Sequence, residues 1–408
     1  MNKTMMKKYA ELIVKVGANV RPGQEVWISY GLEQLDFLTM LVKECYKAKA
    51  RRVEVIYSNS DVAKLNNKYM KVNDLGTFLP HELSKLQYSV DVLPVRIHIL
   101  SEDPDALKGI DQAKVAKARM MKFPISKPYR DKLDNRQQWT IAAVPSAKWA
   151  KKVYPHLTKK EAVEALWQAI LRMSHASLDP IEEWKKHNAY LKEKMDKMNA
   201  LDIDYLEYHS SNGTDFKVWL TPKSKWIAGG ETNIANGVYY NPNIPTEECF
   251  TSPWAGKAEG VVHASKPLSY NGELIEDFSI YFKDGKVDHV EAKKNQKLLE
   301  IMISQDEGAK MLGEVALVPF ESKVNQEKTI FYETLFDENA CCHLALGQGF
   351  SNCYEGFENM TPEEIKAAGI NDSMIHVDFM IGTRDLSIKA HLRDGSVKDI
   401  FKEGTWAI

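Results

Sequence analysis

The sequence has few cysteines, no long apolar run and almost no surplus of charge. Its five cysteines are odd in number, lack CxxC spacing and include the adjacent pair Cys341–Cys342, which is poorly suited to a disulfide. No stretch of about 18 apolar residues occurs that could span a bilayer. Glu11 and Lys15 interrupt the only apolar segment near the start, which excludes a signal-peptide core there. These absences predict a soluble cytoplasmic protein with reduced thiols and no membrane partner.

The charge balance excludes further classes of function. The 54 Lys and Arg residues nearly balance the 56 Asp and Glu residues, which gives a formal net charge of -2. Such a chain has no basic surplus with which to bind nucleic acid. Neither GxGxxG nor GxxxxGK[ST] follows a predicted strand, and HExxH is absent. The sequence therefore predicts neither a nucleotide site nor a short-range zinc motif.

At 408 residues the chain is long enough for two domains. Strand-like segments in the first third are separated by helix-periodic ones, which is typical of βαβ units and a mostly parallel sheet. The strand candidates are residues 25–28, 52–57, 92–100 and 139–144. Two helices are expected between residues 159 and 200. Residues 1–200 are therefore predicted to form an α/β domain with a helical closing segment.

After about residue 201 the pattern changes to short alternating stretches separated by turn dipeptides. These dipeptides are Asn212-Gly213, Asn271-Gly272, Asp284-Gly285 and Asp394-Gly395. Each is a strong hairpin signal between extended runs. Residues 201–408 are therefore predicted to form an α+β, largely antiparallel β-rich domain, with one helix near residues 295–311.

This second domain carries a dispersed set of carboxylates and imidazoles. Glu314 stands alone in an apolar stretch, and a buried unpaired carboxylate requires a cationic partner or a metal. The same argument applies to His343. His376 and Asp378 lie two residues apart in an extended run, so their side chains share one face about 7 Å apart. Taken singly, however, each has an ordinary structural explanation, such as a satisfied core histidine or a surface alternation. The adjacent Glu247 and Glu248 are equally compatible with an exposed loop.

Long segments of the sequence resemble the thermophilic aminopeptidase family of metallopeptidases, the M29 peptidases typified by aminopeptidases T and S. The similarity extends nearly from end to end. The matching segments are residues 8–14, 108–111, 139–141, 242–248, 266–272, 275–278 and 331–340, together with those around His343 and His376. Stretches of this length are highly specific.

The resemblance implies a homodimeric metallo-aminopeptidase, which removes N-terminal residues from small peptides with a free N-terminus. The catalytic domain is then expected to use a water activated by two divalent metal ions, zinc or cobalt, with magnesium or manganese as further options. The family's ligand positions fall on Glu248, Glu314, His343, His376 and Asp378. Glu314 is the expected bridging ligand. Glu247 is expected to transfer a proton or to support a ligand.

The sequence departs from this family at one position. Family members often carry a tyrosine seven residues after the first histidine ligand, where this chain has Phe350. A phenyl ring cannot donate a hydrogen bond, and Tyr354 could replace the phenol only if its loop is rearranged. This departure leaves a catalytically weak peptide-binding homologue open as an alternative. Independently of it, a metallohydrolase that uses the same metals on a non-peptide amide also stays open.

Overall fold

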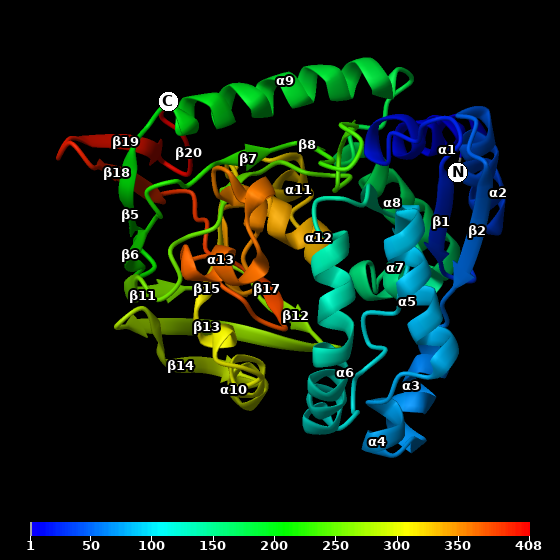
Figure 1. The fold of residues 1–408 in the computed structure, drawn as a ribbon, viewed down its shortest axis with the longest axis horizontal. Coiled ribbons are helices and arrows are strands. Elements are labelled where there is room, and N and C mark those ends of the chain that lie inside the picture. Colours follow the sequence, from blue (N-terminus) through cyan, green and yellow to red (C-terminus); the bar gives the residue numbers. More distant parts are fainter. Residues whose placement is uncertain (1) are drawn as a thin grey trace. The chain divides into compact units, whose positions relative to one another are not determined.

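The computed structural model describes residues 2–408, which divide into two compact units (Figure 1). Unit 1 comprises the residues up to Ala189 and the segment 229–246, and unit 2 comprises residues 190–228 and 247–408. The sequence predicts a single boundary at residue 200, whereas in the structure the chain passes to unit 2 at residue 190 and returns to unit 1 for residues 229–246. Residues 229–246 belong to unit 1 because their backbone pairs there: the N–H of Ile244 donates to the carbonyl of Ile141 at 2.9 Å.

Unit 1 contains the predicted parallel sheet. Its strands are β1 (Glu25–Tyr30), β2 (Arg52–Tyr57), β3 (Val95–Leu100) and β4 (Trp139–Ala143), in the order β2-β1-β3-β4. All three pairings are parallel, which confirms the α/β prediction for this part of the chain. Two short strands, β8 (Glu231–Thr232) and β9 (Tyr239–Tyr240), form a separate antiparallel pair.

Helices precede, connect and follow the strands of unit 1. They are α1 (Lys3–Leu12), which continues as a π-helix (Ile13–Gly17), α2 (Leu35–Lys47), α3 (Ser60–Tyr69), α4 (Val72–Leu75), α5 (Pro80–Val92), α6 (Gln112–Leu133), α7 (Ala147–Val153) and α8 (Lys159–Met173). The next helix, α9 (Pro180–Asn199), begins in unit 1 and ends in unit 2. Thr158 begins α8 with a capping box to Glu161, which satisfies the first free N–H groups of the helix. The ring of Trp167 in α8 packs against Phe37 with centroids 5.5 Å apart, so a buried aromatic contact anchors the closing helix.

Unit 2 is β-rich and antiparallel, as predicted, and its strands form two sheets. The larger sheet comprises β5 (Ile203–His209), β6 (Asp215–Trp219), β11 (Ala258–His263), β12 (Leu268–Tyr270), β13 (Glu273–Lys283), β14 (Lys286–Lys294), β18 (Ser387–Leu392), β19 (Val397–Lys402) and β20 (Thr405–Trp406). Asn271-Gly272 and Asp284-Gly285 both have positive φ at each residue, as a type I′ turn requires. The first turn connects β12 to β13, and the second connects β13 to β14. Figure 1 shows β13 and β14 as a long hairpin. The predicted helix near residues 295–311 is α10 (Gln296–Ile303), followed by a 3₁₀ turn (Gly308–Lys310).

The smaller sheet of unit 2 has the order β17-β16-β15-β10-β7. Its strands are β7 (Ile227–Ala228), β10 (Cys249–Thr251), β15 (Leu312–Leu317), β16 (His343–Gly347) and β17 (His376–Met380). Short helical segments lie between β15, β16 and β17 along the chain: α11 (Lys323–Gln326), α12 (Thr334–Asp337), α13 (Pro362–Ala367) and 3₁₀ turns at Glu338–Ala340, Ser351–Cys353 and Phe357–Asn359. Apolar side chains from both sheets form one core; Phe278 of β13 and Phe379 of β17 meet in it with ring centroids 6.0 Å apart.

Two further sequence predictions concern the cysteines and the membrane-spanning segments. All five cysteines are buried and free of disulfides. No helix among residues 2–408 is long and apolar enough to cross a membrane.

Candidate metal centre

One face of the smaller sheet is apolar and the opposite face carries the predicted ligands. Leu344, Leu346 and Phe379 point into the core of unit 2. Side chains alternate along a strand, so His343 of β16 and His376 and Asp378 of β17 project from the other face. The small residues Ala345 and Gly347 stand between these polar side chains in the register and leave room for them.

A β-bulge places Glu314 on this same face. The register of β15 against β16 shifts between Leu312 and Glu314, so that Leu312 pairs with Leu346 whereas Glu314 pairs with Ala345. Because the bulge reverses the alternation of side chains, Leu312 stays in the core while Glu314 faces the ligands. A Cβ on Gly313 would lie 2.2 Å from the carbonyl oxygen of Gln348, which explains the glycine at the bulge.

The five predicted ligands converge into two groups of three. Possible ligand atoms of Glu248, Glu314 and His343 all lie within 4.8 Å of one another, and so do those of Glu314, His376 and Asp378. Nε2 of His343 is 3.3 Å from Glu248 Oε2, and Nε2 of His376 is 3.0 Å from Glu314 Oε2. Glu314 belongs to both groups. Its two carboxylate oxygens are therefore placed to join two neighbouring positions.

The surroundings of His376 fix which of its nitrogens faces the carboxylates. Its Nδ1 lies 2.7 Å from the carbonyl oxygen of Gln348, which can only accept a hydrogen bond. Nδ1 therefore carries the proton, and the lone pair of a neutral ring points from Nε2 toward Glu314 and Asp378. A histidine ligand held through its other ring nitrogen is the usual arrangement at a metal.

The cluster contains more carboxylates than its own cations can neutralise. Glu248, Glu314, His343 and Asp378 are each less than 9 % exposed, whereas the His376 side chain is 26 % exposed and marks the accessible side. Oδ1 of Asp378 is buried without a hydrogen-bond partner, although Nε2 of His376 is only 3.2 Å away. An orphaned buried carboxylate oxygen beside imidazole nitrogens is a donor set that fits divalent cations.

The pKa values of these side chains reflect mutual coupling. Burial, aided by the charges of Glu248 and Asp378, raises the pKa of Glu314 to about 7, against a hydrogen bond with His376. Burial alone would lower the pKa of His343, but the carboxylates of Glu248 and Glu314 outweigh it and raise that pKa to about 9. Perturbed pKa values of this kind gather at functional sites.

Glu338 is a member of the site that the sequence analysis missed. It lies in the 3₁₀ turn before His343, is 9 % exposed, and forms a hydrogen bond with Asp378. Burial and the charges of Asp378 and Glu248 raise its pKa well above the usual value. The available signal was the polar triplet Asp337-Glu338-Asn339 between apolar residues. We call Glu338 and the five predicted ligands together the carboxylate–histidine cluster.

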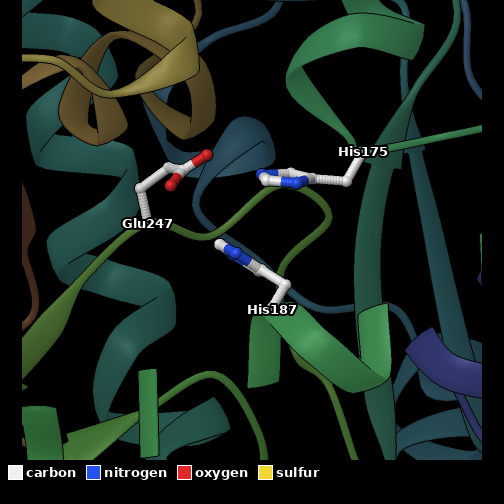
Figure 2. Close-up of side chains that lie close together, drawn as sticks. All are labelled: His175, His187 and Glu247. Carbon is white, nitrogen blue, oxygen red and sulfur yellow. The ribbon is translucent and has the colours of Figure 1, made fainter. Parts of the chain in front are cut away.

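Glu247 is buried but belongs to neither of the two groups that contain Glu314. Its backbone N–H donates to Oδ1 of Asn339 at 2.7 Å, which links its peptide to the turn that holds Glu338. Figure 2 draws its side chain with His175 and His187, two histidines of unit 1 whose ring centroids lie 4.0 Å apart. Nε2 of His187 lies 2.7 Å from the carbonyl oxygen of Thr246, the last residue of unit 1 before Glu247.

Phe350 lies beside the accessible side of the cluster. Its ring centroid is 4.9 Å from that of His376 and 5.4 Å from that of Phe250, and its backbone N–H donates to Ser252 Oγ at 2.7 Å. Tyr354 lies elsewhere, paired in a β-bridge with Ser224 and with the Lys223 ammonium 6.0 Å from its ring centroid. The phenyl ring therefore occupies the place next to His376.

Comparisons of the sequence and of the structure with known proteins identify the same family. Residues 2–406 match the family model described as thermophilic metalloprotease (M29). The chain is 36 % identical over 404 residues to aminopeptidase AmpS of Bacillus subtilis (strain 168), which covers 98 % of each protein. It is 34 % identical to aminopeptidase T of Thermus aquaticus, covering 99 % of this chain and 98 % of that one. The solved structure of wild-type AmpT from Thermus thermophilus matches with a TM-score of 0.89 and 33 % identity over the full length of both chains.

Proposed function

Since the chain belongs to the thermophilic metalloprotease (M29) family and is thereby a metallo-aminopeptidase, we propose that the carboxylate–histidine cluster is its catalytic site. Its substrates are then small peptides with a free N-terminus, from which it removes the first residue. The observation that carries the proposal is the position of Glu314, which is shared by both groups of possible ligands.

We propose that the cluster holds two divalent metal ions, zinc or cobalt, with magnesium or manganese as further options. Glu248, His343 and Glu314 would hold one ion, and Glu314, His376 and Asp378 the other. When bound, such ions supply Lewis acidity, which activates a water for attack and polarises the scissile carbonyl. Mixed imidazole and carboxylate ligands suit zinc and cobalt, and the orphaned oxygen of Asp378 supports the assignment.

The protein's own side chains have separate roles in this proposal. Glu314 would be shared by the two ions, and the hydrogen bond from His376 to the Gln348 carbonyl orients that imidazole. A carboxylate is also needed to carry a proton to the leaving amine. Sequence reasoning assigned this role to Glu247. The geometry favours Glu338 as a second candidate because Glu338 contacts Asp378 inside the cluster.

Two matched substitutions separate these candidates. We expect Glu338→Gln to lower kcat about 100-fold, because it removes an ionisable group that touches a ligand, and Glu247→Gln to lower kcat about 10-fold or less. Metal content, measured by mass spectrometry, should stay near that of the parent in Glu247→Gln. A larger loss of kcat in Glu247→Gln than in Glu338→Gln, at unchanged metal content, would assign proton transfer to Glu247.

Phe350→Tyr is expected to raise kcat, by about 10-fold. A phenol beside His376 adds a hydrogen-bond donor at the accessible side of the cluster, where negative charge develops on the carbonyl oxygen. The measurement is steady-state hydrolysis of an aminoacyl arylamide, with Phe250→Tyr as the control for adding a hydroxyl to a neighbouring ring. An unchanged or lower kcat in Phe350→Tyr would show that this position does not limit the reaction.

A free amino group on the substrate distinguishes the proposed function from its alternatives. We expect leucine arylamide to be hydrolysed and N-acetyl-leucine arylamide to be inert, because an aminopeptidase must bind the α-ammonium group. Equal hydrolysis of both would favour a metallohydrolase of non-peptide amides. Metal-loaded protein that hydrolyses neither, and yet binds peptides, would favour the catalytically weak homologue.

Two further properties are proposed on the strength of the family membership. The enzyme is a homodimer, as sedimentation equilibrium would test, and it acts in the cytoplasm on peptides rather than on nucleic acid or at a membrane. The five buried free thiols support a reducing compartment.

A further inference from the structure

A crevice of about 160 Å³ lies in unit 1 where the four parallel strands end. Gly31, Ser58 and Ser101, the residues that follow β1, β2 and β3, line it, as does Ser146 after β4. The chain leaves β1 toward β2 on one side and then returns for β3 on the other side. Ligands of open α/β sheets bind at this reversal, outside the carboxyl ends of the strands.

At the reversal, Gly31 lies close to Ser101, and the Ser101 hydroxyl makes no hydrogen bond within the described part of the chain. A Cβ on Gly31 would lie 2.3 Å from Oγ of Ser101, so any larger residue at position 31 would clash with this hydroxyl. Ser101 is 7 % exposed, and among the described residues its hydroxyl has no hydrogen-bond partner. A buried hydroxyl without a partner in a crevice is free to bind a ligand.

The lining carries a surplus of negative charge. It includes one ammonium group, that of Lys148, and four carboxylates, those of Glu33, Asp61, Glu102 and Asp103. Nζ of Lys148 is 2.5 Å from Asp61 Oδ1 and 3.4 Å from Asp103 Oδ2. The crevice therefore already holds one ammonium group of the chain, and the remaining carboxylates favour a second cation.

Several backbone N–H groups beside the crevice already donate to side chains of the chain. Oδ1 of Asn59 accepts from the N–H groups of Asp61 and Val62 at the start of α3. The N–H of Ala147 donates to Glu33 Oε2 at 2.9 Å. With these donors engaged, an ammonium group fits the crevice better than a phosphate or an isolated carboxylate does.

We propose that this crevice binds a small free amino acid through its α-ammonium group. Its volume is below the range of sites for drug-sized ligands, which matches a molecule as small as alanine. The Ser101 hydroxyl would accept from the ammonium group beside the carboxylates of Glu33, Glu102 and Asp103. Lys148, which also pairs with Asp61 and Asp103, would face the carboxylate of the amino acid. The choice of an amino acid rests on the proposed function, since amino acids are the products that an aminopeptidase releases. The crevice is then a second, non-catalytic site for the product.

Binding is tested on the full-length Glu314→Gln protein after chelation, so that the carboxylate–histidine cluster does not contribute. Calorimetric titration should show saturable binding of L-alanine and L-alaninamide with a dissociation constant of about 1 mM. N-acetyl-L-alanine, which lacks the ammonium group, should not bind. Ser101→Ala and Asp103→Asn should each weaken binding at least about 10-fold, whereas Ser84→Ala, on the exposed face of α5, should leave it unchanged.

Three outcomes would overturn the proposal: no saturable binding of alanine or alaninamide, equal binding of N-acetyl-alanine, or unchanged affinity in both Ser101→Ala and Asp103→Asn. Circular dichroism of each variant shows whether it is folded. Turnover of aminoacyl arylamides by the unsubstituted, metal-loaded protein is measured separately. Alanine binding without any turnover would overturn the proposed function and leave the crevice site intact, and turnover without alanine binding would do the reverse.

Discussion

Glu314→Gln should reduce kcat for aminoacyl arylamides by about 10³-fold or more and lower the metal content of the purified protein. Glu314 is buried on the ligand face of β15, and its oxygens lie within reach of both histidines. A glutamine has nearly the same shape, but its amide offers one neutral oxygen in place of two charged ones. It can therefore no longer join two cations, and the charge that balances them falls by one.

Glu307→Gln is the matched control for that experiment. Glu307 belongs to the same unit, but its side chain is 81 % exposed and pairs with Lys286 at the surface. We expect activity and metal content close to those of the parent protein. Full activity in Glu314→Gln, with the metal content of the parent, would refute the assignment of the cluster as the catalytic site.

Much of the fold follows from local sequence signals. The strand Arg52–Tyr57 and the turn at Asp284-Gly285 can be predicted because the pattern that indicates each one lies within a few neighbouring residues. The return of residues 229–246 to unit 1 could not be predicted in this way, because it depends on pairing between Ile244 and Ile141, which lie about a hundred positions apart.

The site was predictable only in part, for a similar reason. The spacing of His376 and Asp378 correctly predicts one shared face, since β17 is a regular strand. The same rule would place Glu314 on the face of Leu312, and only the bulge at Gly313 separates them. Glu338 lies on a 3₁₀ turn rather than a strand, so no strand periodicity could indicate its direction.

The second large effect is expected from removing the metal ions. Without them, four buried carboxylates (Glu248, Glu314, Glu338 and Asp378) share two imidazoles, and Glu338 has a strongly raised pKa. An ion at 100 times its dissociation constant stabilises the folded state by about 2.7 kcal/mol. For a unit of this size, restoring one ion should therefore raise Tm by roughly 5–10 °C. Differential scanning calorimetry of chelated protein, before and after addition of zinc or cobalt, measures the shift.

The size of that shift should also depend on pH. The carboxylates beside His343 raise its pKa to about 9 in the metal-free cluster, so at pH 7 the imidazole holds a proton that an ion must displace. Metal affinity, and with it the increase in Tm at a fixed metal concentration, should therefore grow as the pH rises from 6 toward 9. Glu314→Gln serves as the control, because most of its metal-dependent shift should be lost. A shift of equal size in Glu314→Gln, or one that shrinks as the pH rises, would place the stabilising ions outside the carboxylate–histidine cluster.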